Sequence, residues 1–246
     1  MKYLKYIAGI LLLILVAGFF LLKFFSEEKP HGNSGPEADK LAMSMLVALG
    51  KEAFDTIPYL EFEFFAGGHK YFWDKKNNQA IVAWDNIQVV LDLDQVSGVA
   101  TKNGESMSGT DQDEAIQTAW SYWCNDSFWM IAPFKCFDPG TTRKVVIDED
   151  GKNNLLLEYA SGGVTPGDSY LWILDDQNVP SGWKMWTQIL PVKGAYTSWE
   201  GWETMMGAKL STKHKLAGKE VSMKGVRVGK NWAEFGYETD PFATLD

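Results

Sequence analysis

Three histidines, several carboxylate pairs and two cysteines are the residues of this chain that could carry chemistry. The histidines are His31, His69 and His214, and none lies in an HExxH motif, in a nucleophile elbow or beside a carboxylate partner in the sequence. A Ser-His-Asp triad can assemble from distant residues, but no local pattern supports one. The sequence therefore predicts a protein that is not an enzyme.

Two acidic pairs, Asp92/Asp94 and Asp148/Asp150, have the residue types that glycosidases use. The first pair falls on the polar face of an alternating segment, and the second borders a hairpin turn. The sequence DEDG at 148–151 also falls short of a calcium loop, because its glycine comes too early. We interpret these acids as solvated residues, and we expect no metal ion and no cofactor.

Cys124 and Cys136 are the only cysteines. Outside the cytoplasm two thiols can pair, and a disulfide that closes a loop of this size would stabilise the fold by about 3 kcal/mol. Two buried free thiols are the alternative, and spacing alone does not decide between them. A disulfide here would be structural, because the pair lacks the CxxC spacing of redox-active sites.

The cysteines lie in an aromatic stretch, WSYWCNDSFWMIAPFKCFDPG at 120–140. Asp111, with Glu114 three residues later, has the pattern of a capping box and predicts that a helix starts here. The residues after it recur at helical spacing: Ala115, Ile116, Ala119, Trp120 and Trp123. A helix with an aromatic face, set into a β-rich chain, either completes the core or plugs an apolar cavity that accepts a lipid-like ligand.

The segments on both sides of this helix have the period of β-strands. Apolar residues alternate with glutamates in Leu60–Phe64, and Asp150-Gly151 marks a tight hairpin. About nine or ten strands follow one another, too many for an open sheet to stay flat. We therefore expect a mainly β (α+β) fold, a curled antiparallel half-barrel with a covering helix over Asp39–Phe54 and the aromatic helix as a plug.

The N-terminal segment predicts a membrane anchor. Lys2 and Lys5 precede the uncharged apolar run Tyr6–Leu22, which at about 17 residues is near the lower limit for crossing a bilayer. A cleaved signal peptide is the alternative, but its small-residue site at Val16-Ala17-Gly18 lies inside the apolar run. We expect a transmembrane anchor (1–25), a flexible polar tether (26–38) and an exported domain (39–246).

Charge and composition exclude several classes of function. The formal net charge is −9, and the chain after residue 29 holds 19 basic and 30 acidic residues, so nucleic acid is not an expected partner. There is no Walker loop, no GxGxxG after a strand and no tandem cysteine pair of the zinc type. Eleven Trp and fourteen Phe fit an apolar or sugar ligand, and they also fit a large β core.

The order of these segments resembles the bacterial lipoprotein-carrier superfamily, the LolA- and LolB-like half-barrels. The resemblance extends from Asp39 to Val228 and is most specific at YW…NDSFW…PFK…DPG between Tyr122 and Gly140. A second part is YLWILD at Tyr170–Asp175, with Pro180 and Trp183-Lys184 after it.

This resemblance implies a non-catalytic protein that binds a lipid, an acyl chain or a lipoprotein. It also places the predicted anchor in the inner membrane and the domain on the periplasmic side. Carriers of this superfamily are soluble or lipid-anchored, whereas a protein with a transmembrane anchor does not cross the periplasm freely. Presenting or sensing a lipid near the inner membrane fits an anchored protein better than long-range shuttling.

A cavity that binds an acyl chain needs only apolar walls, because each methylene buried in it contributes about 0.8 kcal/mol to binding. The candidate wall residues are Phe62, Phe64, Trp73, Leu91, Leu157 and Trp172, and the candidate plug residues are Trp120, Trp123, Phe128 and Trp129. Each of them could instead pack in the core. An exported carbohydrate-binding or hydrolytic domain with exposed tryptophans, and an assembly protein with a filled core, remain the alternatives.

Overall fold

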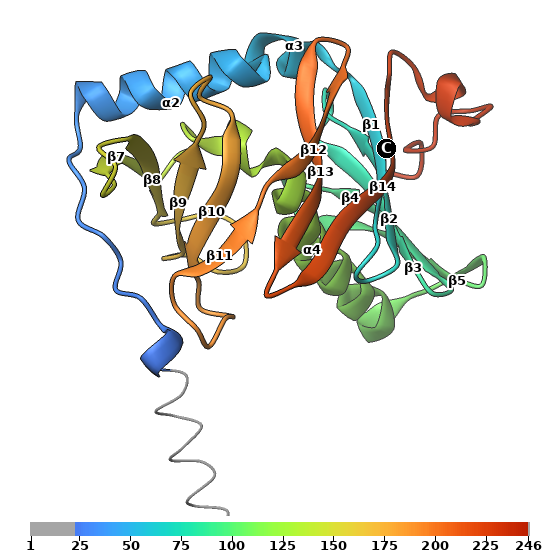
Figure 1. Ribbon diagram of the computed structural model, residues 1–246. Coiled ribbons are helices and arrows are strands. Elements are labelled where there is room, and N and C mark those ends of the chain that lie inside the picture. The colour runs from blue at the N-terminus through green and yellow to red at the C-terminus, as the bar shows by residue number, and fades with distance from the viewer. Residues whose placement is uncertain (1–22, 246) are drawn as a thin grey trace, which may run out of the picture.

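A single antiparallel sheet of 14 strands forms most of the protein (Figure 1). The structure, a computed structural model, describes residues 23–245. The strand order is β6-β5-β4-β3-β2-β1-β14-β13-β11-β10-β9-β8-β7, and β12 pairs with β13. The strands are β1 (Tyr59–Phe64), β2 (His69–Asp74), β3 (Gln79–Trp84), β4 (Ile87–Asp92), β5 (Ser97–Lys102), β6 (Glu105–Ser106), β7 (Thr141–Ile147), β8 (Asn153–Tyr159), β9 (Ser169–Leu174), β10 (Pro180–Trp186), β11 (Ala195–Ser198), β12 (Glu200–Met205), β13 (Ala208–Leu216) and β14 (Lys219–Gly229).

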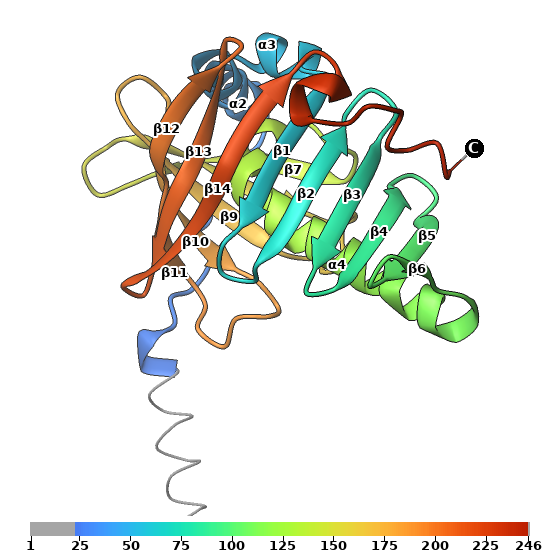
Figure 2. The same ribbon diagram turned by 90° about the vertical axis from the view of Figure 1, so that its right-hand side faces the viewer.

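Two meanders make up this sheet, β1–β6 and β7–β14, and they join where β1 pairs with β14. The strands β6 and β7 are consecutive in the chain but lie toward opposite edges of the sheet. The helix α4 (Gly109–Ile131) and the short helix η1 (Ala132–Lys135) connect them. At 1.5 Å per residue α4 is about 34 Å long, and it crosses the concave face of the curled sheet (Figure 2). The expected mainly β fold, with a curled antiparallel sheet and a helix, is confirmed.

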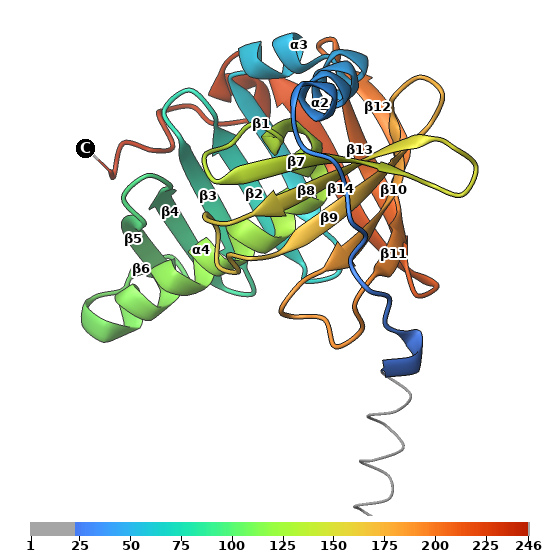
Figure 3. The same cartoon turned by 90° about the vertical axis from the view of Figure 1, so that its left-hand side faces the viewer.

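One end of the curled sheet is covered by α2 (Pro36–Leu49) and α3 (Lys51–Thr56), as Figures 1 and 3 show. The apolar face of α2 is buried through Met45 and Leu49. The two helices meet at Gly50, which has φ +70°, and a Cβ there would lie 2.3 Å from the carbonyl oxygen of Gly207. The helix predicted over Asp39–Phe54 therefore begins earlier, at Pro36, and is divided at a position that only glycine fits.

Residues 26–33, predicted as part of the tether, lie along the outside of the sheet. The backbone of Asn33 forms an antiparallel bridge with Val145 of β7, and Glu27 N–H donates to the carbonyl of Lys193 at 2.8 Å. Between residues 23 and 245, no helix is long and apolar enough to cross a bilayer. The predicted anchor, residues 1–25, lies almost entirely outside the described residues.

Two local expectations differ from the structure. The helix α4 begins at Gly109 after Ser108, with no side-chain cap, so the capping box predicted at Asp111 is wrong. Since β6 ends at Ser106, the chain has to enter the helix at once, and Asp111 lies in the first turn, where a carboxylate favours the helix dipole. The strand count exceeds the expected number because the polar segment before α4 forms β5 and β6, and because residues 195–205 divide into β11 and β12.

A buried polar cluster ties α4 to the sheet. The Asp126 carboxylate on α4 accepts a hydrogen bond from the Tyr71 hydroxyl at 2.5 Å and lies 2.6 Å from Nδ1 of His69. Tyr122 stacks on the imidazole of His69 with ring centroids 3.8 Å apart. Burial, together with the charge of Asp126, raises the pKa of Tyr71, so this hydroxyl remains a donor. These contacts fix the rotation of the helix about its axis.

Replacing Tyr71 by phenylalanine removes one donor from the buried carboxylate of Asp126. We expect Tyr71→Phe to lower the free energy of unfolding by about 1–3 kcal/mol, because the carboxylate loses a partner that water cannot replace. The measurement is urea denaturation followed by tryptophan fluorescence. Tyr196→Phe removes the same hydroxyl from an exposed residue and should change stability by less than about 0.5 kcal/mol. Equal effects of the two variants would contradict the role given to this cluster.

Candidate functional site

The two halves of α4 pack differently on the concave face of the sheet. The first half of α4 contacts β3, β4 and β5, and its Ala115, Ile116 and Ala119 are buried in the main core cluster. The helix therefore occupies the concavity of the first meander. The second meander curls away from the helix and leaves space beside it.

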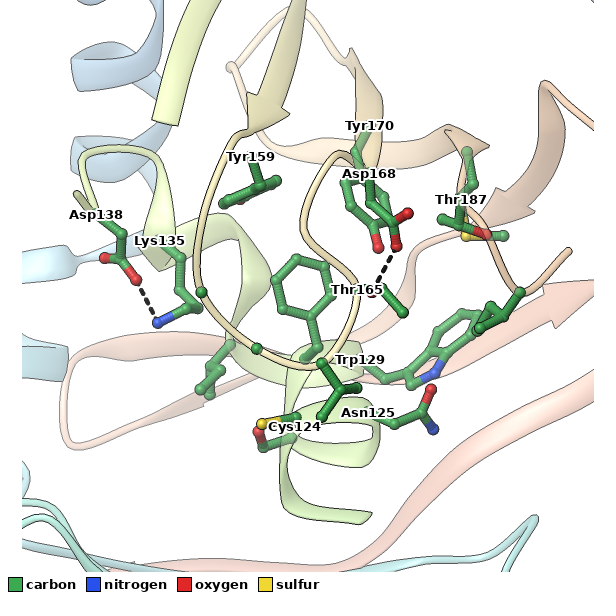
Figure 4. Close-up of a pocket in the computed structure, with 18 of the residues that line it drawn as sticks. Cys124, Asn125, Trp129, Lys135, Asp138, Tyr159, Thr165, Asp168, Tyr170 and Thr187 are labelled. Carbon is green, nitrogen blue, oxygen red and sulfur yellow. Dashed lines mark hydrogen bonds and ion pairs between the residues drawn. The ribbon is translucent and has the colours of Figure 1, made fainter. Parts of the chain in front are cut away.

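That space is a cavity of about 670 Å³ between the second half of α4, the strands β8–β10 and two loops, 161–168 and 187–190 (Figure 4). Its volume falls within the range of about 300–1,000 Å³ that is common for small-molecule sites. The helix contributes Trp120, Phe128 and Trp129, and the sheet contributes Tyr170 and Met185. The walls are thus mainly aromatic and apolar.

The predicted site residues fall into two groups. The four candidate plug residues Trp120, Trp123, Phe128 and Trp129 all line this cavity. The six candidate wall residues are buried in the core and do not line it: Phe62, Phe64, Trp73, Leu91, Leu157 and Trp172. Side chains of the protein cover these positions. Phe62, for example, stacks on Tyr71 with ring centroids 4.5 Å apart and meets Trp123 at 6.5 Å.

Sequence reasoning missed most of the wall residues, among them Tyr159, Tyr170, Trp183 and Met185. The two-residue period of a β-strand could have identified two of them, because Tyr159 shares a strand face with Leu157 and Tyr170 shares one with Trp172. Leu157 and Trp172 are buried in the main core cluster. The cavity lies two residues farther along each strand, beside the loops.

A buried carboxylate joins the two loops at the rim of the cavity. Asp168 accepts a hydrogen bond from the Thr165 hydroxyl at 2.8 Å and another from the backbone N–H of Gln188 at 2.9 Å. Burial and the neighbouring Asp168 raise the pKa of Tyr170, so its phenol stays protonated. At the other side of the rim Lys135 pairs with Asp138. The acidic groups of the rim are therefore held by partners within the protein.

Both cysteines are free thiols in this structure. Cys124 lines the cavity, and the buried Cys136 donates its S–H to the carbonyl of Pro133 at 2.9 Å. Burial raises the pKa of each thiol to about 12, which makes both poor nucleophiles near neutral pH. Among residues 23–245, no His, Cys, Asp and Glu side chains gather in a group that could hold a metal ion.

Behind the cavity His214 lies within a layer of tryptophans. Its ring centroid is 4.5 Å from that of Trp199 and 5.4 Å from that of Trp129, which lines the cavity. Trp183, also in the cavity wall, meets Trp199 at 4.9 Å. Burial lowers the pKa of His214 to about 4, so the ring is neutral at pH 7. This layer supports the cavity wall by apolar packing.

Comparison with known proteins found a distant structural likeness. The chain is similar to the crystal structure of a DUF1329 family protein from Desulfovibrio piger ATCC 29098, with a TM-score of 0.39 and 11% sequence identity over 83% of this chain and 98% of that one. No protein family and no curated protein matched the sequence. The function is therefore argued from the cavity itself.

The pKa of His214 predicts a loss of stability in weak acid. The unfolded chain takes up a proton near pH 6.5 and the folded chain only near pH 4, so stability falls as the pH drops between these values. Between pH 7.5 and pH 5 this one group should lower the free energy of unfolding by about 2 kcal/mol. Urea denaturation at both pH values measures the loss, and His214→Gln should abolish this part of it.

His31→Gln is the matched control, because His31 is exposed and lies outside the packed core. If His214→Gln and His31→Gln lose the same stability between the two pH values, the neutral, buried state of His214 is refuted.

Proposed function

We propose that this chain is a membrane-anchored binding protein that takes an acyl chain of a lipid or a lipoprotein into the cavity and performs no reaction on it. The observation that carries the proposal is the aromatic-walled cavity of about 670 Å³ beside the second half of α4. A dozen methylenes buried there would contribute on the order of 10 kcal/mol, before the loss of chain freedom on binding is subtracted.

The inward orientation of the tryptophan side chains favours this proposal over a sugar-binding or hydrolytic domain. All eleven tryptophans lie among residues 23–245, and none of their side chains is exposed. A sugar-stacking platform presents flat rings to the solvent, whereas a lipid site turns them inward around a void. Trp120, Trp123, Trp129 and Trp183 surround the cavity in the second way.

The proposal also draws on the resemblance to the lipoprotein-carrier superfamily. A curled antiparallel sheet with a helix across its concave face is the architecture that this resemblance predicts. In this scheme residues 1–25 anchor the chain in the inner membrane and the β domain faces the periplasm. The anchored domain presents or senses a lipid near the membrane and does not travel.

A photoactivatable fatty acid, added to proteoliposomes that carry the full chain, tests the proposal. We expect cross-links in α4 around Phe128 and in β9–β10 around Tyr170 and Met185, mapped by mass spectrometry of the digested protein. Leu190→Trp places a larger side chain at the cavity and should reduce these cross-links about ten-fold, because the space for the acyl chain is lost.

Ile147→Trp is the matched control, since Ile147 is exposed on β7 and does not line the cavity. It should leave the cross-links unchanged. Cross-links confined to residues 1–25, or unaffected by Leu190→Trp, would refute acyl-chain binding in the cavity.

A further inference from the structure

Part of the rim of the cavity lies at the end of the molecule where the N-terminal segment reaches the domain (Figure 1). Its rim includes loop 161–168, loop 187–190 and Leu216, which ends β13 at the β13–β14 connection. In Figures 1 and 3 residues 23–27 lie beside the β10–β11 connection at this end, and α2 and α3 cover the opposite end. The rim formed by these loops and the start of the described chain therefore lie on the same side.

Hydrogen bonds through Lys193 join the N-terminal segment to the rim. The backbone of Lys193 donates to Ser26 Oγ at 3.1 Å, and its carbonyl accepts from Glu27 N–H. The ammonium of the same lysine donates to the carbonyl of Leu190 at 3.2 Å, inside the loop that lines the cavity. Trp186 Nε1 adds a bond to the Glu27 carbonyl at 2.9 Å. The position of Glu27 relative to the mouth is therefore fixed.

Little chain is left between this fixed point and the predicted bilayer span. The apolar run Tyr6–Leu22 ends directly before Lys23, so only Lys23–Ser26 separate it from Glu27. Four fully extended residues reach about 14 Å at most, and the helical turn at Lys23–Phe25 shortens that reach. If Tyr6–Leu22 spans the membrane, this end of the domain lies next to the bilayer surface and cannot turn away from it.

The side chains at this end suit a bilayer interface. Phe24 is 81% exposed and Ile189, on the rim, is 65% exposed, while Val164 projects from loop 161–168. The nearby carboxylate of Glu27 pairs with Lys184 at 2.5 Å, so its charge is balanced within the protein. Exposed apolar side chains at a membrane-facing end are shielded when they enter the interface.

We propose that the mouth of the cavity rests on the phospholipid leaflet in which the chain is anchored, so that an acyl chain enters from the bilayer without crossing water. This inference rests on the proposed anchor and ligand. Ile189 and Val164 touch the interface, and Phe24 and Phe25 lie beside them. The N-terminal segment thus serves as the element that orients the mouth.

Fluorophores attached at single cysteines test this orientation in the full chain. Ile189→Cys, Val164→Cys and Val47→Cys are labelled in a Cys124→Ser background, since Cys136 is buried, and are reconstituted in vesicles of phosphatidylethanolamine and phosphatidylglycerol. Val47 is the control, because it is 76% exposed on α2 at the opposite end. Quenching by spin-labelled lipids and by aqueous iodide is measured for each.

We expect lipid-borne quenchers to act at least about three-fold more strongly on the labels at Ile189 and Val164 than on the label at Val47, and iodide to show the reverse order. Equal quenching at all three positions overturns the proposal. The cross-linking experiment separates this outcome from the fate of the proposed function. If the labels at Ile189 and Val164 reach the bilayer but no cross-links form in the cavity, the orientation is supported and lipid binding is refuted. If cross-links form in the cavity but these labels stay exposed to water, only the orientation is refuted.

Discussion

The connection from β6 to β7 is the constraint on which the rest of the structure depends. These strands lie toward opposite edges of the 14-stranded sheet, so α4 has to cross the concave face to join them. A helix in that position buries one face against the sheet, and the polar groups on that face need partners. Asp126 meets this need through Tyr71 and His69, which in turn sets the side of the helix that faces the second meander.

The cavity follows from the same crossing, because one helix cannot fill the whole curl. Where α4 presents Ala115, Ile116 and Ala119, the sheet packs against it and buries these side chains. Where it presents Phe128 and Trp129, these rings contact Tyr170 and Trp183 of the sheet and the space beside them stays open. Tryptophan rings around His214 support this wall from behind. Burial among these rings lowers the pKa of His214 and keeps its imidazole neutral at pH 7.

Local patterns in the sequence predict the elements and their inward faces, but not which inward positions remain uncovered. Leu157 of β8 and Trp172 of β9 are buried in the main core, yet the hollow lies beside Tyr159 and Tyr170 instead. His69 and Asp126 are 57 residues apart, so their pairing has no local signal. The pairing of β1 with β14, which joins the two meanders, likewise depends on contacts between distant segments.

The two ends of the curled sheet differ, and the N-terminal segment connects them. From Glu27 beside the open end, the chain follows the outer strands through the Lys29–Glu158 ion pair and the Asn33–Val145 bridge before α2 covers the far end. The residues next to the predicted anchor and the helix that closes the core are therefore parts of one continuous strap. Because this strap is bonded to β7, β8 and the β10–β11 connection, the domain is fixed in orientation from Glu27 onward, and a membrane at that point would face the cavity and not the closed end.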